Sequence, residues 1–275
     1  MTAPTIRLNN GVEIPQLGFG VFKVPNEETA QSVTTALDAG YRLIDTAAIY
    51  RNEEGVGQAL AHTSIPREDI FVTSKVWNAD QGYDSTLAAF DQTMQKLGLD
   101  ILDLYLIHWP TPARKLFPDT WKAMEQLYRD GRVRAIGVSN FRIEDLQVLL
   151  DGADVVPAVN QVELHPSFSQ PELRAFHAEH GIATEAWGPL GQGKAIHDTV
   201  INEIAARRHK TPAQIILRWH MQIGNIAIPK SVDPDRIAAN LDIFGFELDR
   251  SDMDAINALD TGVRSGGDPS VFGNE

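Results

Sequence analysis

The stretch YRLIDTAAIY (41–50) decides the fold together with two later runs of the same kind, DIFVTSK (69–75) and DLYLIHW (103–109). Each run is short and mostly apolar, as expected for a buried β-strand. The polar side chains at or just beyond the ends of these runs are Asp45, Tyr50, Lys75 and His108. Strand C-termini converge on one face of a parallel sheet or barrel, where α/β enzymes carry their catalytic groups. The sequence therefore predicts an enzyme with a proton-transfer set on that face.

The spacing of the strand ends predicts a barrel. The seven expected ends are Asp45, Lys75, His108, Ser139, Gln161, Glu185 and Ile228, and they are separated by 30, 33, 31, 22, 24 and 43 residues. Each interval is long enough for one strand–helix unit, and eight such units close a barrel. The long last interval holds an additional helix, with Thr211 as its N-cap and Pro212 at its first position.

The full set of expected elements follows the same alternation. Strands are expected near 16–20, 41–45, 69–75, 103–107, 133–138, 156–161, 182–186 and 225–228. Helices are expected at about 26–38, 53–62, 83–97, 118–130, 143–150, 170–179, 198–208 and 233–241. Two alternating runs around Asn9-Asn10-Gly11 predict a β-hairpin. We therefore expect one domain over residues 1–275, a (β/α)8 TIM barrel with an N-terminal hairpin at its bottom and extra helices late in the chain.

Composition excludes several kinds of function. The chain has 275 residues, no cysteine and a formal net charge of −13. It therefore has no thiol nucleophile or thiolate metal site, and no basic stripe that would neutralise nucleic acid. The sequence contains no run of about 18 apolar residues, so no membrane span is predicted, and we expect a cytoplasmic protein. The histidines are scattered, so no metal is expected, and His177 and His180 are interpreted as exposed helix residues.

The four strand-end side chains suit the addition of a hydride and a proton to a carbonyl group. A free phenol has a pKa near 10, and an ammonium such as Lys75 would lower the pKa of Tyr50. Asp45 supplies the opposite charge that a buried Lys75 needs. His108 can donate a hydrogen bond to an oxygen held near Tyr50. Each residue alone has an ordinary structural explanation, and only their joint placement indicates a site.

Seven ordered motifs then resemble the aldo-keto reductase superfamily. They are GYRLIDTAAIYRNEEGVG (40–57), FVTSKVWN (71–78), LDLYLIHWP (102–110), IGVSNF (136–141), NQVELHP (160–166), WGPLGQGK (187–194) and IPKSVDPDRIAANLDIF (228–244). The match runs essentially from Gly18 to Phe246. Within the superfamily, the chain looks most similar to the bacterial 2,5-diketo-D-gluconate reductase group.

The resemblance implies roles for the site residues and a bound NADPH. Tyr50 becomes the general acid, Lys75 tunes its acidity, Asp45 pairs with Lys75, and His108 positions the carbonyl. Ser139, Asn140 and Gln161 match positions that hold the nicotinamide carboxamide, and Trp187 matches an aromatic residue that stacks on the ring. The loop residues expected to cover the pyrophosphate are Gly188, Leu190 and Gly191. The residues expected to hold the adenosine 2′-phosphate and adenine are Lys230, Ser231, Val232, Arg236 and Asn240.

The substrate is expected to be an aldehyde, a ketone or an α-dicarbonyl compound, such as 2,5-diketo-D-gluconate or a methylglyoxal-type compound, held between aromatic walls. The wall residues beside Tyr50 and His108 are Phe22, Trp77 and Trp109. Loops 110–118 and 262–275 are expected to tune specificity, and Arg114 and Lys115 either attract an acidic sugar or are simply solvated. A monomer is the family expectation. Two alternatives remain open, a Schiff-base aldolase with Lys75 as nucleophile and a cofactor-binding regulatory or structural protein.

Overall fold

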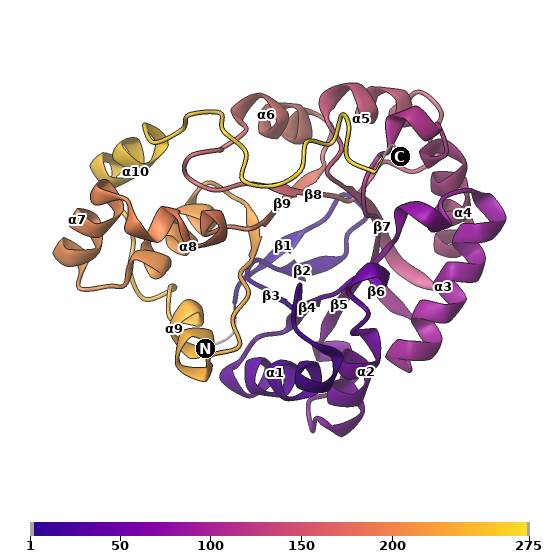
Figure 1. Cartoon of the computed structure of the whole chain (residues 1–275), viewed down its shortest axis with the longest axis horizontal. Coiled ribbons are helices and arrows are strands. Elements are labelled where there is room, and N and C mark those ends of the chain that lie inside the picture. Colours follow the sequence, from indigo (N-terminus) through magenta and orange to yellow (C-terminus); the bar gives the residue numbers. More distant parts are fainter. Residues whose placement is uncertain (1–2, 274–275) are drawn as a thin grey trace.

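Eight parallel strands form the centre of the molecule in a computed structural model that describes residues 3–273 (Figure 1). The strands are β3 (Phe19–Gly20), β4 (Leu43–Asp45), β5 (Phe71–Val76), β6 (Leu102–Ile107), β7 (Val133–Ser139), β8 (Val159–Glu163), β9 (Ala183–Trp187) and β10 (Ile226–Ile228). They pair in chain order from β3 to β10. A parallel bridge between Leu17 and Ala227 joins the first strand to the last, so the sheet closes on itself. The predicted TIM barrel is confirmed.

Helices surround the barrel and begin close to the predicted positions. They are α1 (Asn26–Ala39), α2 (Glu53–His62), α3 (Tyr83–Leu97), α4 (Phe117–Arg129), α5 (Ile143–Leu150), α6 (Pro171–Glu179), α7 (Thr199–Arg208), α8 (Pro212–Gln222), α9 (Pro234–Leu241) and α10 (Arg250–Asn257). Helix α8 begins at the predicted cap, where the Thr211 hydroxyl accepts from the Gln214 N–H and Gln214 Oε1 accepts from the Thr211 N–H. Within residues 3–273, no helix is both long enough and apolar enough to cross a bilayer.

Helix α10 fits the expected extra helices late in the chain, but its bounds were not predicted, although its start carries a recognisable signal. Asp249 precedes the helix and its side chain accepts a hydrogen bond of 2.9 Å from the Asp252 N–H, which is ordinary N-capping. The helix has only eight residues and few apolar side chains, so its periodicity is weak. Arg207 and Arg208 of α7 bind the Asp252 carboxylate, and these contacts between distant segments fix the helix in place.

The N-terminal hairpin closes one end of the barrel. Its strands are β1 (Thr5–Arg7) and β2 (Glu13–Pro15), which pair antiparallel. Leu8 and Ile14 of this segment are buried in a cluster with apolar side chains from the strands, among them Leu43, Phe71 and Leu104. The predicted hairpin at the barrel bottom is therefore confirmed, and the functional residues lie at the opposite end.

His177 corrects the prediction that it is an exposed helix residue. Its side chain is fully buried between α6 and the outer face of the barrel. One ring nitrogen is 2.9 Å from Asn160 Nδ2 and the other is 2.9 Å from Thr184 Oγ1. Burial, aided by the nearby Arg174 and His180, lowers the pKa of His177 to about 3. Spacing along the helix alone did not reveal which of the two histidines faces the barrel.

Candidate active site

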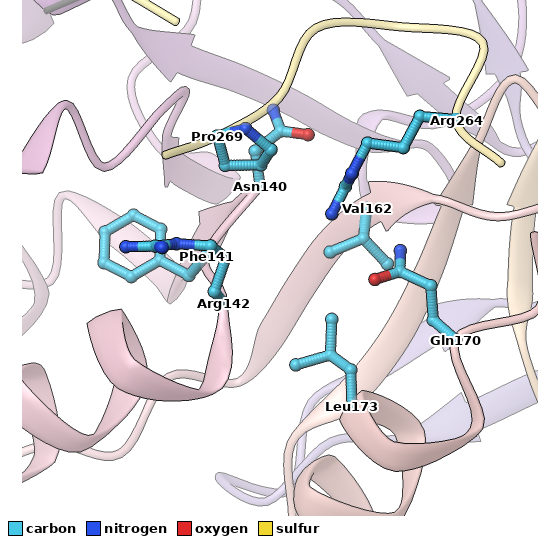
Figure 2. A pocket seen from close by; sticks show the side chains of 8 residues that line it. All are labelled: Asn140, Phe141, Arg142, Val162, Gln170, Leu173, Arg264 and Pro269. Carbon is cyan, nitrogen blue, oxygen red and sulfur yellow. The ribbon is translucent and has the colours of Figure 1, made fainter. Parts of the chain in front are cut away.

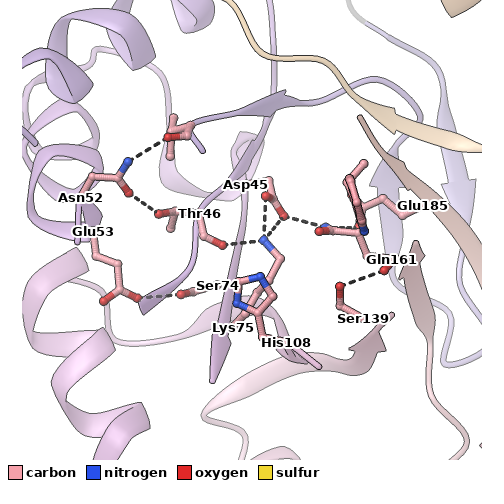
Figure 3. Close-up of polar contacts among 12 residues, drawn as sticks. Asp45, Thr46, Asn52, Glu53, Ser74, Lys75, His108, Ser139, Gln161 and Glu185 are labelled. Carbon is pink, nitrogen blue, oxygen red and sulfur yellow. Dashed lines mark hydrogen bonds and ion pairs between the residues drawn. The ribbon is translucent and has the colours of Figure 1, made fainter. Parts of the chain in front are cut away.

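A buried ion pair stands at the centre of the site (Figure 3). Lys75 Nζ donates to both carboxylate oxygens of Asp45 at 2.7 and 2.8 Å, and to the Thr46 carbonyl at 2.8 Å. These three bonds use all three ammonium hydrogens. Burial alone lowers the pKa of Lys75, but the charge and hydrogen bonds of Asp45, together with Tyr50 and Glu185, outweigh burial, so the pKa lies above its ordinary value. Lys75 is therefore a fixed cation, whereas a Schiff-base nucleophile must be a neutral amine.

Tyr50 lies above this ion pair on a short 3-10 helix, Ala48–Tyr50, that follows β4. The Lys75 ammonium is 5.1 Å from the centre of the Tyr50 ring. Burial raises the pKa of Tyr50 to about 12, although Lys75 acts in the opposite direction. The expected lowering of this pKa is therefore corrected, because desolvation of the phenolate exceeds its attraction to the ammonium. Tyr50 holds its proton at neutral pH.

His108 lies just beyond β6 with its ring against that of Tyr50. The two ring centres are 5.6 Å apart, and the Trp77 ring is 5.2 Å from His108 on another side. Burial, followed by the repulsion of Lys75, holds the pKa of His108 well below its ordinary value. Its Nδ1 atom is buried and finds no hydrogen-bond partner within residues 3–273. The ring is therefore a neutral imidazole that can donate one hydrogen bond.

Polar side chains at the ends of β7, β8 and β9 form a connected group on the other side of the ion pair. Asn140 Nδ2 donates to the His108 carbonyl at 2.9 Å and to Ser139 Oγ at 3.1 Å. Ser139 Oγ donates to the Gln161 carbonyl at 2.8 Å. Trp187 Nε1 donates to Asn140 Oδ1 at 2.8 Å. The structure thus brings together all four residues that the sequence assigned to the nicotinamide side.

Gln161 joins this group to the ion pair through a residue that the sequence did not identify as functional. Its Nε2 atom donates to Asp45 Oδ2 at 2.8 Å and to Glu185 Oε2 at 2.9 Å. Glu185 served in the sequence only to mark the end of a strand. The position of Glu185 in an apolar run could have indicated a role in the site, because a fully buried carboxyl group requires a partner.

The loop after β9 has the backbone that close approach to a phosphate needs. Gly188, Gly191 and Gly193 have φ values of 59°, 58° and 86°, in the left-handed region that favours glycine. A Cβ atom built on Gly188 or Gly193 would meet no atom within 4 Å, so their outer faces are open. However, the N–H groups of Gly191 and Gly193 already donate within the loop, to Gly188 and Leu190. Contact with phosphate through these two amides would require the loop to adjust.

The predicted cationic cluster begins in the loop after β10, continues into α9 and faces solvent. Lys230 is exposed, and the Arg236 side chain is 79% exposed and 3.8 Å from Asp233. Val232 is 51% exposed between them, whereas Asn240 is buried. Two open cations beside an exposed apolar residue fit a phosphate next to an aromatic base. The residues of the loop and the cluster therefore suit NADPH.

A family model and individual relatives match the chain over most of its length. The model described as "Aldo/keto reductase family" matches residues 16–197 and 197–261. The chain belongs to this family. An aldo-keto reductase of Mycolicibacterium smegmatis is 57% identical, with 98% of each chain covered. A glyoxal reductase of Bacillus subtilis is 53% identical, with 96% of each chain covered.

A solved structure of similar shape adds a cofactor to the comparison. The crystal structure of a Gox0644 point mutant in complex with NADPH has a TM-score of 0.95 and 49% identity, and the match covers 98% of this chain and 99% of that one. As a member of the family, this chain is an NADPH-dependent oxidoreductase that reduces carbonyl groups.

Aromatic side chains border the site of this reductase. Phe22 is 53% exposed, and its ring centre is 5.0 Å from that of Tyr50. Trp109 is only 8% exposed because Phe272 packs on it, with ring centres 4.2 Å apart. The sequence predicted that the segment 262–275 tunes specificity but did not name any residue in it. Residues 274–275 lie outside the described residues. Phe272 is therefore an unpredicted part of the wall.

The tail of the reductase is bound to the barrel by a buried carboxylate. Glu163 accepts hydrogen bonds from the backbone N–H groups of Ser265 and Gly266, at 2.5 and 3.0 Å. Gly266 lies so close to Trp187 that an added Cβ atom would be 2.4 Å from the indole ring. In Figure 1 this yellow segment runs from α10 past α6 and α5. The tail therefore packs directly beside the nicotinamide-side residues.

A narrow crevice separates this tail from the ends of β7 and β8 (Figure 2). The residues that line it are Asn140, Phe141, Arg142, Val162, Gln170, Leu173, Arg264 and Pro269. The Arg264 guanidinium stacks over the Phe168 ring at 4.6 Å, and Arg142 is bound to Asp145 at 2.9 Å.

Arg114 in the loop 110–118 is bound as well, because it donates to the Asn78 carbonyl, whereas Lys115 is exposed.

Proposed function

We propose that this reductase acts on small aldehydes and α-dicarbonyl compounds, with Tyr50 as the proton donor. The observation that carries the proposal is a protonated phenol beside a neutral imidazole and above a buried ammonium–carboxylate pair. Aromatic rings border the same space and help to exclude water from it. The name of the B. subtilis relative supports the dicarbonyl class.

The residues divide the reduction between them. Bound NADPH supplies the hydride, which no side chain can provide. His108 donates a hydrogen bond to the carbonyl oxygen and orients it toward Tyr50. Tyr50 transfers its proton to that oxygen as negative charge develops there. The Lys75 ammonium then stabilises the phenolate, and Asp45 keeps Lys75 charged and in place.

The cofactor is held at both ends by groups that the fold brings together. We assign the carboxamide to Ser139, Asn140 and Gln161, and the face of the nicotinamide ring to Trp187. The pyrophosphate is assigned to the loop with Gly188, Leu190 and Gly191. The 2′-phosphate and adenine are assigned to Lys230, Ser231, Val232, Arg236 and Asn240. Because the net charge of the protein is strongly negative, the attraction for the 2′-phosphate dianion must come mainly from the local cations Lys230 and Arg236.

We expect Arg236→Ala to weaken NADPH binding by roughly 1.5–3 kcal/mol, because a charge-assisted hydrogen bond is lost. NADH binding should change little, since NADH has no 2′-phosphate. Titration of the protein fluorescence with each cofactor measures both effects. Arg250→Ala is the matched control, since Arg250 is also exposed and lies 3.7 Å from an acid. Equal losses for NADPH and NADH would contradict the assignment.

The substrate class is tested by following NADPH oxidation with a panel of carbonyl compounds. The panel contains methylglyoxal, phenylglyoxal and 2,5-diketo-D-gluconate, with NADH in parallel. Turnover of the dicarbonyls with preference for NADPH is the expected result. Tight NADPH binding without turnover of any compound would favour the alternative of a cofactor-binding regulatory protein. A Schiff-base aldolase has no support here, because all three Lys75 hydrogens are bound.

The proposal includes the setting in which the protein works. We propose a cytoplasmic monomer that binds neither nucleic acid nor membranes. The support is the acidic net charge and the absence of cysteine. Sedimentation of the purified protein at several concentrations tests the monomer, and a mass of about twice the 30.3 kDa of the chain would contradict it.

A further inference from the structure

Glu185 is a fully buried carboxyl group next to the catalytic ion pair, and the reaction described above does not use it. Its Oε2 atom accepts a hydrogen bond of 2.9 Å from Gln161 Nε2. Its Oε1 atom is also buried and has no hydrogen-bond partner within residues 3–273. Buried carboxyl groups usually have both oxygens satisfied. This incomplete satisfaction needs an explanation.

Burial and the neighbouring Asp45 carboxylate explain why Glu185 holds a proton. The charged groups that face it are Asp45 on β4 and Lys75 on β5, with the phenol of Tyr50 beyond them. Its strand neighbours contribute only the neutral Gln161 from β8 and the apolar Ile226 from β10. One ammonium cannot neutralise two buried carboxylates, and Lys75 is already committed to Asp45. Burial, together with Asp45, raises the pKa of Glu185 to about 8.

The position of Glu185 places this proton below the nicotinamide side of the site. Glu185 and Trp187 are two residues apart on β9, so their side chains point to the same face and their Cα atoms are about 6.7 Å apart. Gln161 also connects the two sides, because both hydrogens of its Nε2 are donated, one to Asp45 and one to Glu185 (Figure 3). The Gln161 amide is therefore held in one orientation, and within residues 3–273 its Oε1 atom has no hydrogen-bond partner.

We propose that Glu185 is a positioning residue that fixes the Gln161 amide and carries a proton whose release is coupled to the charge of the nicotinamide. The proposal rests on the proposed binding of the nicotinamide beside Gln161 and Trp187. A reduced nicotinamide ring is neutral, whereas the oxidised ring carries a positive charge. A positive ring near Glu185 favours its ionised form and a neutral ring does not. Binding of NADP+ then releases a proton, and binding of NADPH leaves the proton in place.

The sign of the pH dependence follows from this coupling. Below the pKa of about 8, NADP+ must displace a proton from Glu185 to gain the attraction. Above this pKa, Glu185 is already a carboxylate and attracts the positive ring without losing a proton. NADP+ therefore binds more tightly as the pH rises. Two unit charges on the order of 10 Å apart in a medium of effective dielectric about 20 change an equilibrium by roughly tenfold. We therefore expect the ratio Kd(NADP+)/Kd(NADPH) to fall about tenfold between roughly pH 6.5 and 9.5.

Fluorescence titration of the purified protein with NADP+ and NADPH across this pH range tests the proposal. The ratio is informative because both cofactors carry the same phosphates, so phosphate titration cancels. Tyr50 and Lys75 keep their protons in this range, and His108 stays neutral. Glu185→Gln keeps the size and a hydrogen-bond acceptor for Gln161 but cannot ionise. Its ratio should be independent of pH, and Glu185→Asp should restore part of the slope.

The outcomes separate this inference from the proposed function. A pH-independent ratio in the unmodified protein, or an unchanged slope in Glu185→Gln, would overturn the role of Glu185 while leaving NADPH binding and reduction intact. Failure to bind either cofactor would instead remove the proposed function. A purely structural role for Glu185 predicts that Glu185→Gln weakens both cofactors equally at every pH. Proton uptake or release measured in weakly buffered solution gives an independent check, with more release expected for NADP+ than for NADPH, because the phosphates contribute equally to both.

Discussion

Tyr50→Phe is expected to lower kcat for carbonyl reduction by about 10³-fold, the size of a typical general-acid contribution. The substitution removes one oxygen and leaves the ring, so the contacts with Phe22 and His108 remain. The carbonyl then receives its proton only from water, which the aromatic border excludes. NADPH affinity should stay within about threefold, because the phenol is assigned to the substrate and not to the cofactor.

Single-turnover measurements with methylglyoxal separate this effect from slow product release. The matched control is Tyr83→Phe, which removes the same oxygen from an exposed tyrosine at the start of α3. The control should retain full activity. An unchanged single-turnover rate for Tyr50→Phe would exclude Tyr50 as the proton donor and shift attention to His108.

The sequence predicted the parts of the structure that depend on local patterns. Each barrel strand carries an apolar run, and each run ends within a few residues of a polar side chain, so Asp45, Lys75 and His108 could be placed at one end of the barrel. The turn at Asn9-Asn10-Gly11 and the Thr211 cap could also be predicted, because immediate neighbours determine their conformation. Seven motifs in order then indicated the family.

The parts that escaped prediction all depend on contacts between distant segments. Phe272 reaches Trp109 only because the tail crosses the barrel, and no local pattern encodes that path. The burial of His177 depends on which side of α6 meets β8 and β9. The raised pKa of Tyr50 reflects how much water the surrounding residues remove, which the neighbouring charges alone do not reveal.

Lys75→Met should destabilise the fold by about 3–5 kcal/mol as well as abolish most activity, because it breaks a buried ion pair. Methionine fills a similar volume but leaves the Asp45 carboxylate buried without a cation. Among residues 3–273, the Asp45 carboxylate then keeps only the hydrogen bond from Gln161. At about 2–4 °C per kcal/mol for a chain of this size, the Tm should fall by roughly 6–20 °C.

The double variant Asp45→Asn/Lys75→Met distinguishes the two contributions of the pair. It removes both charges, so most of the lost stability should return, because uncharged side chains cost far less to bury. Activity should not return, since no ammonium remains to stabilise the Tyr50 phenolate. Thermal unfolding and single-turnover rates, measured on the two single variants and the double variant, complete a double-mutant cycle. Recovery of both stability and rate would mean that the pair is only structural, and that Tyr50 gives up its proton without help from Lys75.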